Sequence, residues 1–115
     1  MAGMAEARWL TVQEVDARNR AKRAAAREAL PRLLAEASRG KPWHCILFGS
    51  LARGDFHPYS DADVVIVDGG EDWAIAEHAV HDVAAQLGVK ADISFWEFLS
   101  ERVRGEIRRD GIPCL

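Results

Sequence analysis

The sequence predicts a mixed α+β fold in which a small three-stranded mixed sheet is backed by helices. Three observations support this prediction. Two short apolar runs, at 45–48 and 64–67, are rich in β-branched or aromatic residues and are bounded by turn formers, so each is expected to be a buried strand. The segment 89–95 alternates between apolar and polar residues, as a strand with one buried face does. Stretches with helical periodicity lie before and between these strands.

An N-terminal helical region is expected over residues 11–39. Thr11 and Glu14 fit a capping box, and Leu10 with Val15 fits the hydrophobic staple around it, so the helix should begin at Thr11. Pro31 should kink or break this helix, because proline removes a backbone donor and crowds the preceding turn. Gly40 then ends the helical region.

Further along the chain, a turn at 68–70 precedes a second helix over 72–87. Its apolar residues recur at steps of three and four, which places them on one face. They are Trp73, Ala76, Val80, Val83 and Leu87. Gly88 closes this helix. After the third strand, a last helix is expected over 96–109, with Leu99, Val103 and Ile107 turned inward and Asp110-Gly111 as its stop.

The bulk composition indicates one ordinary globular domain over residues 1–115. The chain has 49% apolar and 29% charged residues and a formal charge of −3, which argues against direct binding of nucleic acid by general electrostatic attraction. No apolar run approaches the roughly 20 residues that span a bilayer, and the N-terminus lacks a signal-peptide pattern. Two cysteines do not make a disulfide framework, so a cytoplasmic location is expected.

The connection between the first two strands carries the most informative pattern. Gly49-Ser50 follows the first strand, and Asp61 and Asp63 open the second. Residues i and i+2 of a strand point to the same face, roughly 7 Å apart at Cα. Two adjacent carboxylates repel each other unless a positive charge lies between them. A divalent cation such as Mg²⁺ supplies that charge and also binds phosphate oxygens, so the pattern predicts a metal-dependent phosphoryl or nucleotidyl site.

This pattern closely resembles the signature of the DNA polymerase beta-like nucleotidyltransferases. The signature is Gly-Ser, ten residues and then Asp-x-Asp, which here is Gly49-Ser50 followed by Asp61-Ala62-Asp63. The fuller form, with Arg53 and Gly54 after the Gly-Ser pair and Ser60 before the aspartates, resembles the minimal nucleotidyltransferase (MNT) branch. The resemblance runs from about Leu30 to Gly111 and leaves the preceding residues unexplained.

The resemblance implies a nucleotidyltransferase-like fold and a set of site residues. Asp61 and Asp63 would hold two Mg²⁺ ions, and Asp92 on the third strand would complete the metal-binding and catalytic set. The implied nucleotide-binding residues are Gly49, Ser50, Arg53 and Ser60. Glycine lets the backbone approach a phosphate closely, and the serine adds a hydroxyl donor. The sequence leaves open whether Arg53 contacts a phosphate or pairs with a carboxylate.

The resemblance also implies a function. The expected reaction is transfer of AMP from ATP onto a protein hydroxyl, with the chain acting as antitoxin of a helical HEPN-type ribonuclease toxin. Two alternatives remain open at this point: neutralisation of the partner by contact alone, and transfer to a small molecule. The second is disfavoured, because the chain has no evident substrate domain.

Several other features favour structural explanations. The basic residues Arg20, Lys22, Arg23 and Arg27 are interpreted as a solvated helix face in preference to a nucleic-acid contact. His78 and His81 are interpreted as surface residues, because no third metal ligand is evident. Trp73 and Trp96 are expected in the core.

Overall fold

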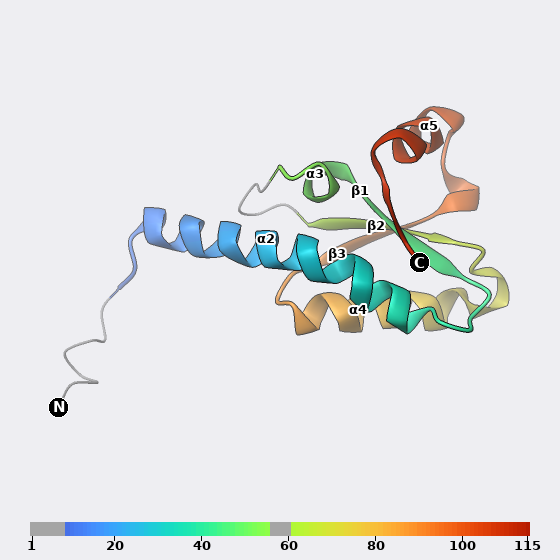
Figure 1. Ribbon diagram of the computed structural model, residues 1–115, viewed down its shortest axis with the longest axis horizontal. Helices are drawn as coiled ribbons and strands as arrows, with labels where there is room; N and C mark the ends of the chain where they lie inside the picture. The colour runs from blue at the N-terminus through green and yellow to red at the C-terminus, as the bar shows by residue number, and fades with distance from the viewer. Residues whose placement is uncertain (1–8, 56–60) are drawn as a thin grey trace.

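The computed structural model describes residues 9–55 and 61–115, and its centre is a four-stranded mixed sheet (Figure 1). The strands are β1 (His44–Phe48), β2 (Ala62–Val67), β3 (Ala91–Phe95) and β4 (Ile112–Cys114), in the spatial order β3-β2-β1-β4. β1 pairs antiparallel with β2 and β4, whereas β2 and β3 run parallel. The predicted mixed α+β class and the three predicted strands are therefore confirmed.

The prediction of only three strands was wrong. The fourth strand, β4, follows the last helix and places Cys114 opposite Cys45 of β1. It has three residues and contains Pro113, so it carries no readable strand pattern. Proline is tolerated here because β4 is an edge strand. Burial of Cys114 in the core holds the segment against the sheet.

Helices cover both faces of the sheet. α2 (Val12–Ala37) and α4 (Trp73–Gln86) pack on one face, while α3 (Gly49–Ala52) and α5 (Glu101–Asp110) pack on the other (Figure 1). The main core lies between the sheet and the α2–α4 layer. Its largest buried side chains include Leu30, Leu34, Trp43, Leu47, Val64, Ile66 and Val80. Alternation along β2 turns Ala62, Val64 and Ile66 toward this core and Asp63 toward the opposite face.

α2 begins as the sequence predicts and continues through its proline. The Thr11 hydroxyl accepts a hydrogen bond from the Glu14 backbone N–H at 3.1 Å. Pro31 does not break the helix, because the fully buried Leu30 and Leu34 on either side of it hold this segment against the core. After the helix, Gly40 has a φ of 73°, a left-handed conformation that suits glycine. The N-terminal half of α2 extends beyond the sheet as a projecting arm (Figure 1).

The last predicted helix is divided in two. A short 3₁₀ turn over Trp96–Phe98 precedes α5, and Ser100 caps α5 by accepting a hydrogen bond from the Val103 N–H at 3.3 Å.

The predicted place of Trp73 in the core was wrong. Trp73 follows the 3₁₀ turn Gly70–Asp72, is 53% exposed and packs edge-to-face on Phe95.

The two cysteines are buried free thiols. Burial raises the pKa of Cys45 to about 12, with a further contribution from Cys114, and burial raises the pKa of Cys114 to about 11. Both thiols therefore stay neutral and poorly nucleophilic at physiological pH. Over the described parts of the chain, no helix combines the length and apolarity needed to cross a bilayer.

Candidate active site

Strand register brings two of the predicted aspartates together. Asp63 of β2 lies opposite Asp92 of β3 in the parallel pair and opposite Phe48 of β1 in the antiparallel pair. Residues at matched positions of neighbouring strands point to the same face of a sheet. Asp63 and Asp92, 29 positions apart in the sequence, therefore project side by side on the face that carries α3 and α5.

The Gly-Ser turn lies directly against Asp63. Gly49 has a φ of 74°, and a Cβ built on it would lie 2.2 Å from Oδ2 of Asp63. No side chain larger than hydrogen fits there while the carboxylate keeps its position. Glycine is required at residue 49 both for its backbone conformation and for this close approach. The structure thus joins the two halves of the sequence motif through one contact.

The electrostatics of Asp63 reflect this crowding. Burial raises the pKa of Asp63 above its ordinary value, the charges of Asp92 and Asp61 raise it further, and Arg53 opposes the shift. The ionised form of Asp63 is therefore less favourable than that of a free aspartate. A cation placed among these carboxylates would relieve the repulsion, so the donor set suits a hard divalent metal ion.

Asp61 is less closely associated with this pair. It is exposed and precedes β2, and its charge reaches Asp63, but it also borders pockets on the α2–α4 side. Within residues 9–55 and 61–115, no three His, Cys, Asp or Glu side chains converge closely enough to hold a metal ion. The charges of Asp61 and Asp92 each reach Asp63, and the metal-binding role of the three aspartates stays a prediction. Ser60, the fourth predicted nucleotide-binding residue, lies outside the described residues.

A single helical turn holds the Gly-Ser pair in place. α3 carries Gly49 and Ser50, and its buried residues Leu51 and Ala52 anchor it on the sheet. Arg27 of α2 donates a hydrogen bond from Nη2 to the carbonyl of Ala52 at 3.1 Å. This contact satisfies one of the carbonyls that a helix end leaves unpaired. This contact could not be predicted from the sequence, because Arg27 is one of several basic residues on the same helix.

We expect Arg27→Met to destabilise the protein by about 1–2 kcal/mol, because the Ala52 carbonyl loses its charged donor in a partly buried place. Chemical denaturation should report this loss. Arg32→Met on the same helix is the matched control, since its exposed ion pair with Glu36 contributes little to stability. Equal stability of the two variants would show that the Arg27 contact does not hold α3.

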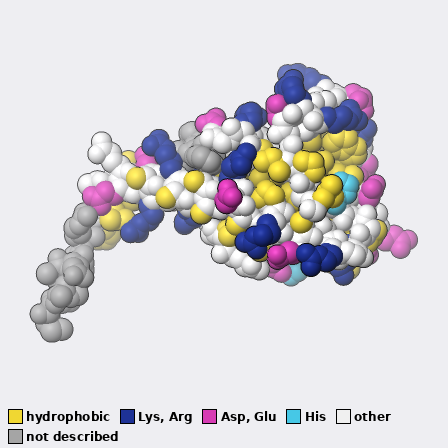
Figure 2. Space-filling model, viewed as in Figure 1, with side chains coloured by type: hydrophobic (Ala, Val, Ile, Leu, Met, Phe, Trp, Pro, Cys, Tyr) yellow, Lys and Arg dark blue, Asp and Glu magenta, His cyan; other side chains and the backbone are white. Residues whose placement is uncertain are grey.

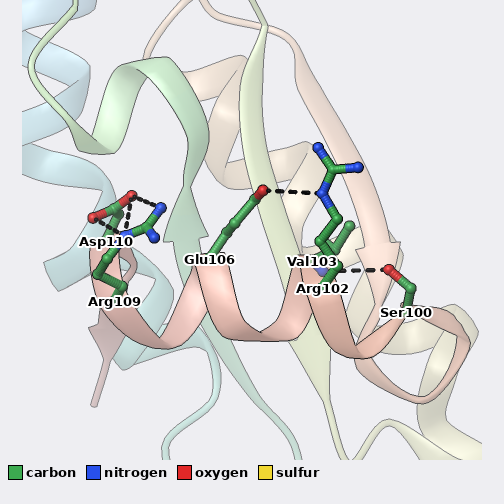
Figure 3. A network of polar contacts seen from close by, with 6 residues as sticks. All are labelled: Ser100, Arg102, Val103, Glu106, Arg109 and Asp110. Carbon is green, nitrogen blue, oxygen red and sulfur yellow. Dashed lines mark hydrogen bonds and ion pairs between the residues drawn. The ribbon is translucent and has the colours of Figure 1, made fainter.

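Arg53 follows α3 and borders a pocket of about 430 Å³ between the motif and α5, here called the α5 pocket. Its walls include Phe48 and Gly49 on one side and Glu106, Arg109 and Asp110 on the other. Figure 3 shows Arg109 and Asp110 pointing toward each other, with Arg109 Nη2 3.1 Å from Asp110 Oδ2. Hydrogen bonding to Arg109 lowers the pKa of Asp110, and the charge of Arg53 contributes.

The sequence left two roles open for Arg53, a contact with a phosphate and an ion pair with a carboxylate. In the described parts of the chain its guanidinium forms no ion pair, and it influences Asp63 and Asp110 through space. Arg53 is exposed and lines the α5 pocket. An exposed arginine beside a carboxylate site can contact an incoming phosphate, because its planar fork matches phosphate oxygens.

Two of the remaining predictions on the surface can be assessed. His78 and His81 lie 3.2 Å and 3.9 Å from Asp82 and Glu77, respectively, as exposed helical neighbours four residues apart. They are surface residues, as predicted. Trp96 is partly buried and is covered by the guanidinium groups of Arg104 and Arg108, each 5.3 Å from the ring centroid.

Comparison with protein families shows which family the chain belongs to. The model of the nucleotidyltransferase domain matches residues 32–113. The chain belongs to the nucleotidyltransferase domain family. The matched range includes the Gly-Ser turn, all three aspartates and the sheet, and it leaves out most of α2. No curated protein matches the chain.

Solved structures extend the comparison. The chain is similar to a protein provisionally named a minimal nucleotidyltransferase, at 28% identity and a TM-score of 0.58, over 77% of this chain and 89% of the other. It is also similar in fold to a chain from a crystal structure of a toxin-antitoxin with AMP-PNP, at 19% identity and a TM-score of 0.59, over 74% and 72% of the two chains. The resemblance to the minimal nucleotidyltransferases is thereby confirmed.

Proposed function

We propose that this nucleotidyltransferase moves AMP from ATP onto a hydroxyl of a partner protein. The observation that carries the proposal is the contact of Gly49 with Asp63, which in turn lies beside Asp92. This contact supports the proposal, because the Gly-Ser turn of the motif then lies against a carboxylate pair. In the reaction, the acceptor oxygen forms a bond to the α-phosphorus of ATP, the bond from that phosphorus to the bridging oxygen breaks, and pyrophosphate leaves with the electron pair.

The residues divide into two groups in this proposal. Gly49, Ser50 and Arg53 orient the phosphates of the nucleotide, while the carboxylate of Asp92 helps to take the proton of the attacking hydroxyl. Asp61, Asp63 and Asp92 would hold two Mg²⁺ ions, which supply positive charge to the phosphates when bound. Correct positioning by the strands and by α3 would provide much of the acceleration, because the reacting groups then meet in one orientation.

The proposed partner is a helical toxin of the HEPN type. The similarity to a chain of a toxin-antitoxin structure with AMP-PNP supports a toxin as the partner and an ATP-like nucleotide, whereas the HEPN type is implied by the resemblance to the MNT branch. The projecting arm of α2 offers a surface for such a partner. Figure 2 shows Lys and Arg side chains along this arm, and Val12 is 75% exposed there. We also propose that residues 1–115 act as one domain in the cytoplasm, with 11–39 as its N-terminal helical region.

A second candidate function is neutralisation of the partner by contact alone. The projecting arm of α2 favours this function, because it offers a surface on which a partner can dock without any catalysis. Enzymatic transfer should silence a partner ribonuclease at substoichiometric amounts of the chain when MgATP is present. Contact should require equimolar amounts and should not depend on ATP.

The metal dependence of nucleotide binding tests the proposed site. We expect the chain to bind ATP with Mg²⁺ much more tightly than ATP in EDTA, because the crowded carboxylates need a cation before they accept a phosphate. Isothermal titration calorimetry with and without EDTA measures this difference. Equal affinity in the two conditions would remove the metal from the proposal.

A further inference from the structure

A second pocket lies beside Asp61, on the side of the sheet that α2 and α4 cover. It has a volume of about 260 Å³ and is here called the α2 pocket. α2 contributes Asn19, Lys22 and Arg23 to its lining, and the segment between α4 and β3 contributes Gly88 and Lys90. The family match begins at residue 32, so the helical wall of this pocket is no part of the matched domain.

Arg23 is the unusual residue of the α2 pocket. It is only 8% exposed, and its Nε and Nη1 atoms are buried without a hydrogen-bond partner in the structure as described. A buried guanidinium is costly unless its donors are satisfied. In other proteins such groups are nearly always paired with a carboxylate, a carbonyl or a bound anion. Arg23 lines the α2 pocket with this hydrogen-bonding capacity unused, so a small shift of its side chain would turn buried donors toward a ligand there.

Two lysines add to the positive charge around Arg23. The Lys22 side chain runs across Gly88, where an added Cβ would lie 3.2 Å from its Cδ and 3.5 Å from its Nζ. Lys90 is fixed next to the start of β2, because its carbonyl accepts a hydrogen bond from the Ala62 N–H at 2.8 Å. Three cationic side chains thus share the pocket with one carboxylate, that of Asp61. The local excess of positive charge favours an anion.

We propose that the α2 pocket binds a phosphate group that is not part of the nucleotide. The planar fork of Arg23 and two ammonium groups suit the oxygens of a phosphate, which accepts several charge-assisted hydrogen bonds at once. The nucleotide site proposed above lies elsewhere, at Gly49 and Arg53 beyond the end of β1. Asp61 borders the α2 pocket and acts on Asp63, so the bound phosphate lies next to the proposed active site. This last placement rests on the proposed function.

Calorimetric titration with inorganic phosphate in EDTA tests the proposal. Arg23→Met should weaken phosphate binding by at least about 10-fold, the scale expected for loss of a charged hydrogen-bonding partner. Arg20→Met on the same helix is the matched control, because it makes the same charge change at an exposed position outside the pocket. It should bind phosphate as the unmodified chain does. Equal binding by all three proteins would overturn the proposal.

Thermal unfolding distinguishes a ligand-binding Arg23 from a purely structural one. The melting temperature of Arg23→Met should change in opposite directions in the two cases. Without phosphate, Arg23→Met should melt at a higher temperature than the unmodified chain, because an unpaired buried charge is replaced by an apolar side chain of similar length. Added phosphate should raise the melting temperature of the unmodified chain and not that of the variant. A lower melting temperature for Arg23→Met without phosphate would contradict the proposal.

Competition with ATP separates the two possible sources of the phosphate. Saturating ATP should leave the affinity for inorganic phosphate unchanged, and displacement by ATP would overturn the assignment to a separate ligand. The variant Asp63→Asn separates this proposal from the proposed function. It should lose nucleotidyl transfer and keep phosphate binding that depends on Arg23. If the chain transfers no nucleotide yet binds phosphate in this way, the proposed function fails and the α2 pocket stands.

Discussion

Asp63→Asn should lower nucleotidyl transfer by at least about 10²-fold, the scale found when one preorganised electrostatic group is removed from an active site. Asp63 lies against Gly49 and beside Asp92, and the charge of Arg53 acts on its carboxylate. No other carboxylate of the described residues combines these three relations, so none is expected to replace it. Asp92→Asn should cause a similar loss. Initial rates of AMP incorporation into the acceptor, per folded molecule, measure the effect.

The stability of Asp63→Asn should change in the direction opposite to its activity. The raised pKa of Asp63 means that its ionised form destabilises the folded chain at pH values above that pKa, and that this cost disappears as the carboxyl takes up a proton at lower pH. In EDTA at pH 7 the variant should therefore melt at a higher temperature than the unmodified chain, and the advantage should shrink as the pH falls toward 3.8, the ordinary value for this carboxyl.

Asp68→Asn is the control for the charge change in both measurements. Asp68 lies just past the other end of β2 and is exposed, and its φ of 59° is one that asparagine adopts readily. Transfer should survive this substitution. If Asp63→Asn melts at a lower temperature and retains its activity, then Asp63 has a structural role and no catalytic one.

Gly49→Ala should also lower transfer by about 10²-fold, the loss that a displacement of about 1 Å can cause in a catalytic group. The added Cβ would lie 2.2 Å from Oδ2 of Asp63, so the carboxylate must move away from its place. Because residue 49 has a φ of 74°, alanine also pays a backbone cost of about 1–2 kcal/mol. Transfer rates and denaturation curves report the two effects separately.

Gly40→Ala isolates the backbone effect. Gly40 has a φ of 73°, and a Cβ built on it meets no atom within 4 Å. It should therefore share the backbone cost of Gly49→Ala and keep full transfer activity. Equal activity of the two alanine variants would show that the close approach of residue 49 to Asp63 is unimportant for the reaction.

The sequence revealed the parts of the site that depend on local spacing. Asp61 and Asp63 fall two apart at the start of an apolar run, and Gly49 falls at the end of another, so both strands and their functional ends could be read from the chain. The pairing of Asp63 with Asp92 followed from the resemblance to nucleotidyltransferases. The register of β2 and β3 agrees with it.

Features set by long-range packing were missed for a physical reason. Arg23 and Arg27 look like members of a solvated basic face, and only the packing of α2 across the sheet buries the first and joins the second to Ala52, 25 positions away. β4 is three residues long, and only its contact with β1 makes it a strand. Periodicity reports which face of an element is buried, but it does not report the partner.

Mass spectrometry of a co-purified partner protein tests the central claim most directly. After incubation with MgATP, the partner should gain the mass of one or more AMP units when the unmodified chain is present in substoichiometric amounts. No gain should appear with Asp63→Asn or in EDTA, whereas Asp68→Asn should act like the unmodified chain. A partner that keeps its mass while equimolar chain, with or without Asp63, still neutralises it would contradict the enzymatic account.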